Sequence, residues 1–133
     1  YHENEFVGFA FAISNEQAFY VSFFAIMPHL RSHGYGGEII DKLVNFYQRT
    51  MLLEIERLDE LCDNPEQRQA RWDFYQRKGF RSANAFLEYD ELSFEILYRG
   101  ESFDEEAYRD IFRRLQEEHY FDFEIKHRRF SDY

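Results

Sequence analysis

The sequence has almost no cysteine and no long apolar run. Its single cysteine, Cys62, excludes an internal disulfide framework and favours a reducing compartment. No apolar run approaches the roughly 18 residues of a membrane-spanning helix, and no signal-peptide pattern is present. We therefore expect a cytoplasmic protein that does not bind a membrane.

Metal-ligand spacing is missing as well. The five histidines and Cys62 do not fall into the short spacings that hold zinc or related ions. The sequence therefore predicts no metal site, and Cys62 is expected to be a small, buried or half-buried side chain.

Positive charge is scarce relative to negative charge. Sixteen lysines and arginines stand against 26 aspartates and glutamates, which gives a formal net charge of −10. An acidic surface repels phosphate backbones, so nucleic-acid binding is disfavoured. The same charge can help to collect a cationic amine, or it can serve solubility alone, and both interpretations stay open.

The chain does contain enough apolar material for one core. Hydrophobic residues make up 44% of its 133 residues and aromatic residues 20%, which is too much for a disordered chain. Neither an internal repeat nor a low-complexity linker is present. Length and composition together predict a single core.

A hairpin and a crossover are expected in the first half. Residues 6–13 and 19–26 are compact apolar runs joined by a short turn, so they predict two antiparallel strands. Pro28 should end the second strand. Residues 38–49 have apolar side chains at helical spacing, and residues 51–55 form a short apolar strand. This order predicts a parallel crossover with its helix packed on the sheet.

The second half predicts further helices and strands. A helix over residues 65–78 would be capped by Asp63 or Asn64 and stopped by Gly79. Two strand-like pieces follow at residues 86–89 and 92–98, with a turn at Asp90-Glu91. Residues 104–118 predict a surface helix. The tail over residues 120–125 alternates apolar and polar side chains, which predicts an edge strand or a partner contact.

A run of glycines lies between the second predicted strand and the first predicted helix. Glycine allows positive φ and close approach of a ligand to the backbone. The first N–H groups of a helix lack intrahelical partners and carry partial positive charge, so Gly34, Gly36 and Gly37 predict an anion site suited to a pyrophosphate. Arg31 and His33 add charge at its rim. The run is neither a Walker loop nor a dinucleotide fingerprint, and glycines at such a turn can also be purely structural.

Four short motifs follow one another along residues 6–98. They are Phe24-Ala25-Ile26 at the end of the hairpin, Arg31-x-x-Gly34-x-Gly36 in the glycine run, Leu53-Glu54-Ile55 in the next strand, and Phe74-Tyr75-x-x-x-Gly79-Phe80 at the end of the second helix. In this order the chain resembles the GNAT superfamily of acetyl-CoA-dependent N-acetyltransferases. By spacing alone, Trp72, Phe74 and Tyr75 are also typical of core aromatics. The resemblance implies an α/β (α+β) fold with helices flanking a central, mixed and mostly antiparallel sheet.

The resemblance also implies roles. The backbone of Phe24, Ala25 and Ile26 would pair with the pantetheine arm of acetyl-CoA, as a peptide pairs with an open strand edge. Tyr75 corresponds to the tyrosine that protonates the departing thiolate in many members. Acetyl-CoA would be a co-substrate, and no tightly bound cofactor is expected. The pyrophosphate would be held by backbone N–H groups, those of Ser32, His33, Gly34, Tyr35, Gly36 and Gly37.

The general base is open at this point. Many family members carry a glutamate on the strand before the glycine loop, where this chain has Ser22, and a serine by itself is no base. Other members use the glutamate of the next strand, which corresponds to Glu54, and Glu56 is the second candidate. Both glutamates can equally be strand residues without a catalytic part. The family's asparagine upstream of the tyrosine is missing, and Arg68 stands near its place.

The chain starts almost at the hairpin, whereas family members have a strand and two helices before it. We therefore expect this strand and these helices to be missing from the 133 residues; a reduced form of the domain is the alternative. Residues 1–100 are predicted to form the acetyltransferase domain, and residues 101–133 a helix and tail that pack on it or on a partner. The apolar face of the last helix and the edge-strand character of the tail predict a homodimer.

Two functions remain in competition. An N-acetyltransferase would move an acetyl group from acetyl-CoA to a primary amine by direct attack in a ternary complex. A non-catalytic CoA-binding or interaction module would keep the scaffold without turnover. A plain structural α/β domain would leave the ordered motifs unexplained. The sequence does not identify the amine, because a fold does not determine a function.

Overall fold

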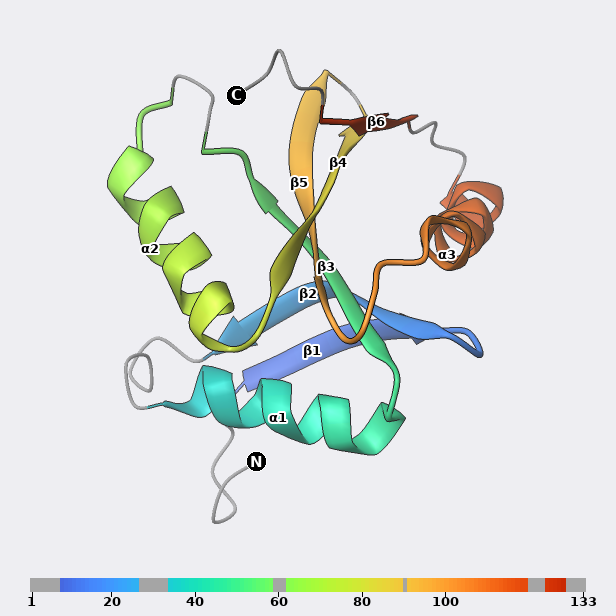
Figure 1. Cartoon of the computed structure of the whole chain (residues 1–133), viewed down its shortest axis with the longest axis horizontal. Helices are drawn as coiled ribbons and strands as arrows, with labels where there is room; N and C mark the ends of the chain where they lie inside the picture. The colour runs from blue at the N-terminus through green and yellow to red at the C-terminus, as the bar shows by residue number, and fades with distance from the viewer. Residues whose placement is uncertain (1–7, 27–33, 59–61, 90, 120–123, 129–133) are drawn as a thin grey trace.

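The computed structural model describes residues 8–26, 34–58, 62–89, 91–119 and 124–128 of the chain (Figure 1). For residues 8–11, 22–26, 89 and 115–119 we describe the backbone alone. The strands are β1 (Gly8–Ser14), β2 (Ala18–Ile26), β3 (Thr50–Glu56), β4 (Arg81–Tyr89), β5 (Leu92–Arg99) and β6 (Glu124–His127). The helices are α1 (Tyr35–Tyr47), α2 (Pro65–Arg77) and α3 (Glu105–His119).

The strands form one sheet in the order β1-β2-β3-β5-β4-β6. The pairs β1–β2, β3–β5, β4–β5 and β4–β6 are antiparallel, and β2 pairs with β3 in parallel. Helix α1 makes the crossover between these two parallel strands. The predicted fold class, a mixed and mostly antiparallel sheet flanked by helices, is therefore confirmed.

Each face of the sheet has its own apolar core. Neighbouring residues of a strand point to opposite faces, and accordingly Tyr20 and Leu52 belong to one core while Phe19 belongs to the other. Figure 1 shows α3 across the strands from the other two helices, so we call the two sides the α3 face and the α1–α2 face. The helices contribute Ala107, Tyr108, Ile111 and Phe112 to the first core, and Ile40, Leu43, Val44, Tyr47, Trp72, Phe74 and Tyr75 to the second.

Side-chain caps fix the hairpin turn and the start of α3. Asn15 Oδ1 accepts hydrogen bonds from the backbone N–H groups of Gln17 at 3.0 Å and Ala18 at 2.9 Å, which closes a turn typical of asparagine. Asp104 Oδ1 accepts in the same way from Glu106 at 3.0 Å and Ala107 at 3.2 Å. This bond pattern supplies acceptors to the first N–H groups of α3.

The expected helices and strands are present with shifted boundaries. Helix α1 begins at Tyr35 rather than at residue 38, because the backbone is already helical after Gly34. Helix α2 ends beside Gly79, whose φ is +88°, as predicted. The predicted side-chain cap of α2 is wrong: Asn64 is the N-cap residue, but its side-chain oxygen accepts from Arg68 Nε at 3.2 Å instead of from the helix backbone.

The tail forms the predicted edge strand. Strand β6 pairs with β4 from Ala85–His127 to Glu88–Glu124, so it starts later and runs further than residues 120–125. Residues 120–123 and Pro28 lie outside the described part of the chain. The described apolar side chains of α3 pack on their own sheet, so of the two surfaces predicted for the homodimer they support the tail rather than this part of the helix. That dimer and the division at residue 100 stay predictions.

Candidate active site

The parallel strands β2 and β3 pair over a short distance. Their register runs from Ala18–Thr50 to Tyr20–Leu52. Beyond these pairs β2 continues for six residues and β3 for four, and no pairing between them is found in the described residues. Figure 1 shows the two strands diverging there, and we call this stretch the strand opening. Backbone N–H and C=O groups that face it can pair with an extended ligand.

A β-bulge lies at the start of the strand opening. In the β1–β2 ladder Ala12 pairs with Val21 whereas Phe11 pairs with Phe23, so Ser22 is an extra residue in β2. A bulge bends its strand and increases the local twist. This bend explains why β2 turns away from β3. Ser22 lies at the bulge because of the register between β1 and β2.

The predicted CoA-binding residues fall into three groups. Phe24, Ala25 and Ile26 lie on the stretch of β2 that no longer pairs with β3. Arg31, Ser32 and His33 lie outside the described residues. Gly34 is the N-cap residue of α1, and Tyr35, Gly36 and Gly37 make up its first turn.

Gly34 sets the geometry of this helix start. Its φ is +82°, in the left-handed region that favours glycine, and a Cβ there would meet no described atom within 4 Å. The backbone conformation, rather than crowding, therefore accounts for glycine at this position. The first intrahelical hydrogen bond runs from the N–H of Glu38 to the carbonyl of Gly34 at 3.2 Å. The N–H groups in the turn between them carry partial positive charge, which favours the binding of an anion.

Lys78, just after α2, reaches the same helix start. A Cβ on Gly37 would lie 3.4 Å from Lys78 Nζ. The ammonium pairs with Asp41 Oδ2 at 3.0 Å, and Arg99 Nη1 pairs with Asp41 Oδ1 at 3.1 Å. Hydrogen bonds from Lys78 and Arg99 lower the pKa of Asp41. Two cations and one carboxylate leave this cluster with one net positive charge, beside a first turn that itself carries the carboxylate of Glu38.

Glu54 lies on β3 in the strand opening, and two tyrosine hydroxyls contact it. The hydroxyl of Tyr20 donates a hydrogen bond to Glu54 Oε1, and the hydroxyl of Tyr108 donates to Oε2 at 3.4 Å. Although Glu54 as a whole is half-buried, desolvation of its carboxyl is the largest effect and raises its pKa to about 7, against the lowering effect of both hydrogen bonds. A carboxyl with this pKa exchanges a proton near neutral pH, which suits a general base.

Tyr75 belongs to the α1–α2 face. Its ring centre lies 5.1 Å from that of Phe74 and 5.4 Å from that of Phe80. Burial raises the pKa of its phenol, while the nearby charge of Arg71 lowers it. The phenol is therefore neutral and able to donate a proton. Because Glu54 contacts side chains of the α3 core, the predicted base and the predicted acid lie on opposite faces of the sheet.

Glu56, the second candidate base, has different partners. It forms ion pairs with Arg68 Nε at 3.1 Å and with Arg71. Arg68, which stands near the place of the family's asparagine, thus ties α2 to the end of β3. Two guanidinium groups already occupy the carboxylate of Glu56, so its geometry is that of a structural ion pair.

Tyr20, Tyr108 and Lys78 were not predicted as site residues. Tyr108 was expected only on the apolar face of its helix, and Tyr20 only as a strand aromatic. Lys78 was expected only as the last residue of a helix. Their hydroxyl and ammonium groups come close to Glu54 and to Gly37 through tertiary packing, and no local pattern signals such a contact.

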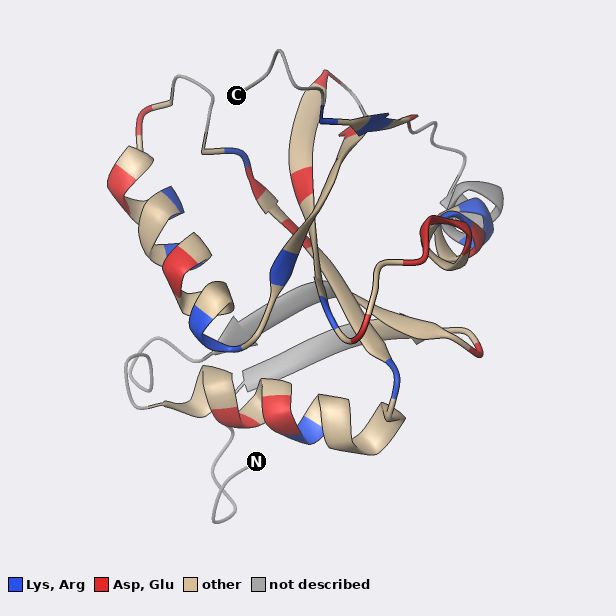
Figure 2. Cartoon of the chain, in the orientation of Figure 1, with Lys and Arg blue, Asp and Glu red and all other residues tan. Residues whose placement is uncertain are grey.

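The described residues provide neither a metal-binding cluster nor a membrane-spanning helix. Within the described residues no group of three or more His, Cys, Asp or Glu side chains is placed to hold a metal ion. None of the described helices is both long and apolar enough to cross a membrane. Figure 2 shows acidic residues spread over α1, α2 and the start of α3 rather than gathered on one element.

Sequence comparison identifies the family. The family model for the acetyltransferase (GNAT) domain matches residues 1–82. The chain belongs to the GNAT acetyltransferase family. A search among curated proteins gives no match.

Solved structures share the fold. A protein from Bacteroides thetaiotaomicron assigned to the GNAT acetyltransferases is 29% identical, with a TM-score of 0.67 over 87% of this chain and 67% of that one. The ribosomal-protein-S18-alanine N-acetyltransferase of Escherichia coli is 15% identical, with a TM-score of 0.59 over 78% and 67%. A GNAT family acetyltransferase from Elizabethkingia anophelis, solved with acetyl-CoA bound, is 11% identical, with a TM-score of 0.57 over 76% and 72%. The chain thus spans about two thirds of the length of the first two structures.

Proposed function

We propose that the chain is an acetyltransferase that passes an acetyl group from acetyl-CoA to a primary amine. The observation that carries this proposal is the strand opening beyond Tyr20–Leu52, with the carboxyl of Glu54 in it. An open strand edge suits the amide-containing pantetheine arm. A carboxyl with a pKa of about 7 suits an acceptor that must lose a proton before it reacts.

The chemistry follows from the two faces of the sheet. Glu54 would take a proton from the substrate ammonium on the α3 face, and the freed nitrogen would attack the thioester carbonyl carbon. A C–N bond forms and the C–S bond breaks in one ternary complex, without an acyl-enzyme. Tyr75 would give its phenolic proton to the departing thiolate on the α1–α2 face. Solvent would take the second proton that the nitrogen loses as it becomes an amide, and it would restore the protonation states of both residues.

The other end of the donor would lie at the start of α1. The N–H groups of Gly34, Gly36 and Gly37 would hold the pyrophosphate, aided by the helix dipole. Lys78 would add a positive charge at 3.4 Å from the position of a Cβ on Gly37. The acetyl-CoA in the Elizabethkingia anophelis structure supports this assignment through the shared fold.

The first experiment measures binding. Titration calorimetry of the full chain with acetyl-CoA and with CoA should give dissociation constants in the micromolar range, as is common for enzyme substrates. An absence of binding to either compound would overturn the proposal.

The second experiment measures turnover. Release of CoA thiol is followed with acetyl-CoA and a panel of amines that includes polyamines, aminoglycosides, amino acids and peptides with free N-termini. Thiol release that depends on one class of amine supports the transferase and identifies its acceptor. Binding of CoA without turnover on any amine would instead favour a non-catalytic CoA-binding module.

A further inference from the structure

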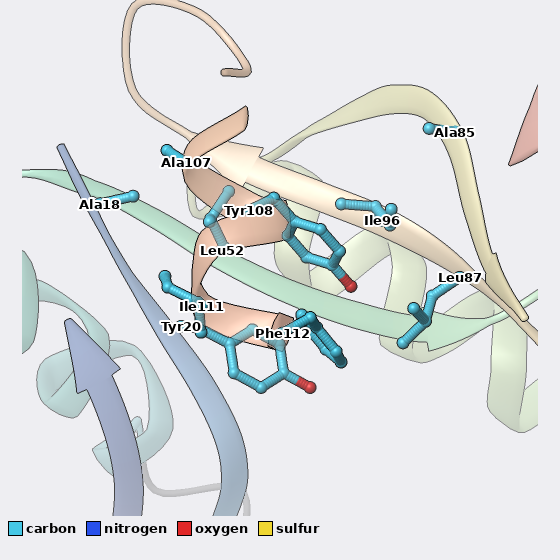
Figure 3. Close-up of a cluster of buried hydrophobic side chains, with 10 residues drawn as sticks. All are labelled: Ala18, Tyr20, Leu52, Ala85, Leu87, Ile96, Ala107, Tyr108, Ile111 and Phe112. Carbon is cyan, nitrogen blue, oxygen red and sulfur yellow. The ribbon is translucent and has the colours of Figure 1, made fainter. Parts of the chain in front are cut away.

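Helix α3 carries Tyr108, whose hydroxyl contacts Glu54, the candidate base. Tyr108 is completely buried, and its hydroxyl donates to Glu54 Oε2 at 3.4 Å while Tyr20 donates to Oε1. Each oxygen of the carboxyl thus has a phenol of its own. Figure 3 shows the two hydroxyl groups pointing toward the same side of the core.

Packing fixes the position of Tyr108. Its ring stacks on Phe112 with centres 4.6 Å apart, and its centre lies 6.1 Å from that of Tyr20 in an edge-to-face arrangement. The start of the helix is tied to the β1–β2 turn, because Asn15 Nδ2 donates to the carbonyl of Ala107 at 3.0 Å. A buried ring held by aromatic neighbours has few alternative rotamers. Its hydroxyl is therefore held in place beside Glu54.

This helix lies outside the residues that match the family, which end at residue 82. We propose that α3 is a working part of the active site, in which Tyr108 is a positioning residue that acts through Glu54 together with Tyr20. The two donors orient the carboxyl and favour its ionised form, which is the form that accepts a proton. The inference rests on the proposed function, since it concerns the same carboxylate.

The two phenols are the described groups that lower the pKa of Glu54. In the described part of the chain, the influences on its pKa are desolvation first, then the hydrogen bond from Tyr20 on β2 and the one from Tyr108 on α3. No described cation or second carboxylate contributes. Loss of either hydroxyl should therefore raise the pKa of Glu54, because desolvation would be opposed by one donor instead of two.

The test titrates Glu54 directly and needs no turnover. The full chain is labelled with ¹³C at its glutamate carboxyls, and the Glu54 signal is identified as the one missing from Glu54→Gln. In Tyr108→Phe the pKa of Glu54 should rise by about 0.5 to 1, and in Tyr20→Phe, which loses the closer donor, it should rise further. Tyr98→Phe is the matched control, because Tyr98 packs against the same core but is not one of the described hydrogen-bond donors to Glu54.

A second variant keeps the fold intact. With 3-fluorotyrosine at position 108 the phenol is more acidic and a stronger donor, so the pKa of Glu54 should fall. In turnover, the acidic limb of kcat/KM should move in the same direction as the titration in each variant. A purely structural role of Tyr108 would lower stability without moving either quantity.

The outcomes separate the inference from the proposed function. If Glu54 titrates alike in wild type, in Tyr108→Phe and in the fluorotyrosine protein, α3 only packs on the sheet and the inference is wrong. If Tyr108→Phe does not fold, the titration of Glu54 in the fluorotyrosine protein is by itself the test of the inference. If the titration responds to position 108 but no amine is acetylated, the positioning role holds and the transferase function fails.

Discussion

The two faces of the sheet bury different acids under similar aromatic cores. On the α3 face the buried group is the carboxyl of Glu54, and on the α1–α2 face it is the phenol of Tyr75. Burial raises the pKa of both groups. The carboxyl reaches about 7 and becomes able to exchange a proton at neutral pH. The phenol starts above neutrality, so burial only strengthens its neutral form.

One physical cause, desolvation, thus favours the proposed roles of Glu54 as proton acceptor on one face and of Tyr75 as proton donor on the other. The strand opening lies between the faces, so a thioester held along β2 would have the acceptor on one side and the donor on the other. The predictions below test this division of roles.

The largest effect is expected for Glu54→Gln. The amide keeps the shape of the side chain but cannot take a proton, so turnover should fall by roughly 10²- to 10⁴-fold while acetyl-CoA affinity stays unchanged. Thiol release and calorimetry measure the two quantities. Glu56→Gln, which loses ion pairs to Arg68 and Arg71, is the control. A greater loss of turnover in Glu56→Gln would move the base to that residue.

The pH dependence of stability should show the buried carboxyl without any substrate. The folded pKa of Glu54 is about 7 and its ordinary value 4.5, so between these pH values the folded state keeps a proton that the unfolded state has released. The contribution of Glu54 to the free energy of unfolding therefore falls as pH rises from about 4.5 to 7, by at most about 3 kcal/mol.

Urea denaturation between pH 4 and 8 measures this effect as the difference between wild type and Glu54→Gln, in which other titrating groups cancel. Wild type should lose stability relative to the variant as pH rises, while its acetyltransferase activity increases through the same range. If the free energies of unfolding of the two proteins change in parallel with pH, folding does not raise the pKa of Glu54. The proposed difference between the two faces would then be wrong.

On the α1–α2 face, Tyr75→Phe should lower kcat by about 10²-fold with little change in acetyl-CoA affinity, because the ring packing is kept and the proton donor is lost. Tyr47→Phe is a suitable control, since Tyr47 packs in the same core, with its ring 4.4 Å from Phe19. An unchanged rate in Tyr75→Phe with a verified acceptor would show that the thiolate leaves without this acid.

The smallest effect is expected at the helix start. Gly34→Ala forces a side chain into the left-handed region at φ +82°, which costs about 1 kcal/mol and should weaken acetyl-CoA binding by a few-fold. Gly34→Ala should also lose thermal stability, and calorimetry compares its acetyl-CoA affinity with that of the wild type. Equal acetyl-CoA affinities in Gly34→Ala and the wild type would show that Gly34 does not hold the pyrophosphate.

Local patterns were sufficient for most of the fold. The hairpin, the crossover helix and the last helix were predictable because apolar periodicity and turn residues act over a few positions. Boundaries were less predictable, since α1 starts inside the glycine run. The bulge at Ser22 escaped prediction because it depends on the register between two strands.

The sequence by itself determined the order of the elements, the glycine-flanked start of α1 and the family. The tertiary structure alone decided that Glu54 lies between two phenols, one of them 54 residues away in Tyr108, and that Tyr75 lies on the opposite face. The reason is that a pKa depends on desolvation and on neighbouring donors. Both come from packing between elements that are distant in the chain. The resemblance could therefore offer Glu54 and Glu56 as candidate bases, but no local pattern could tell their surroundings apart.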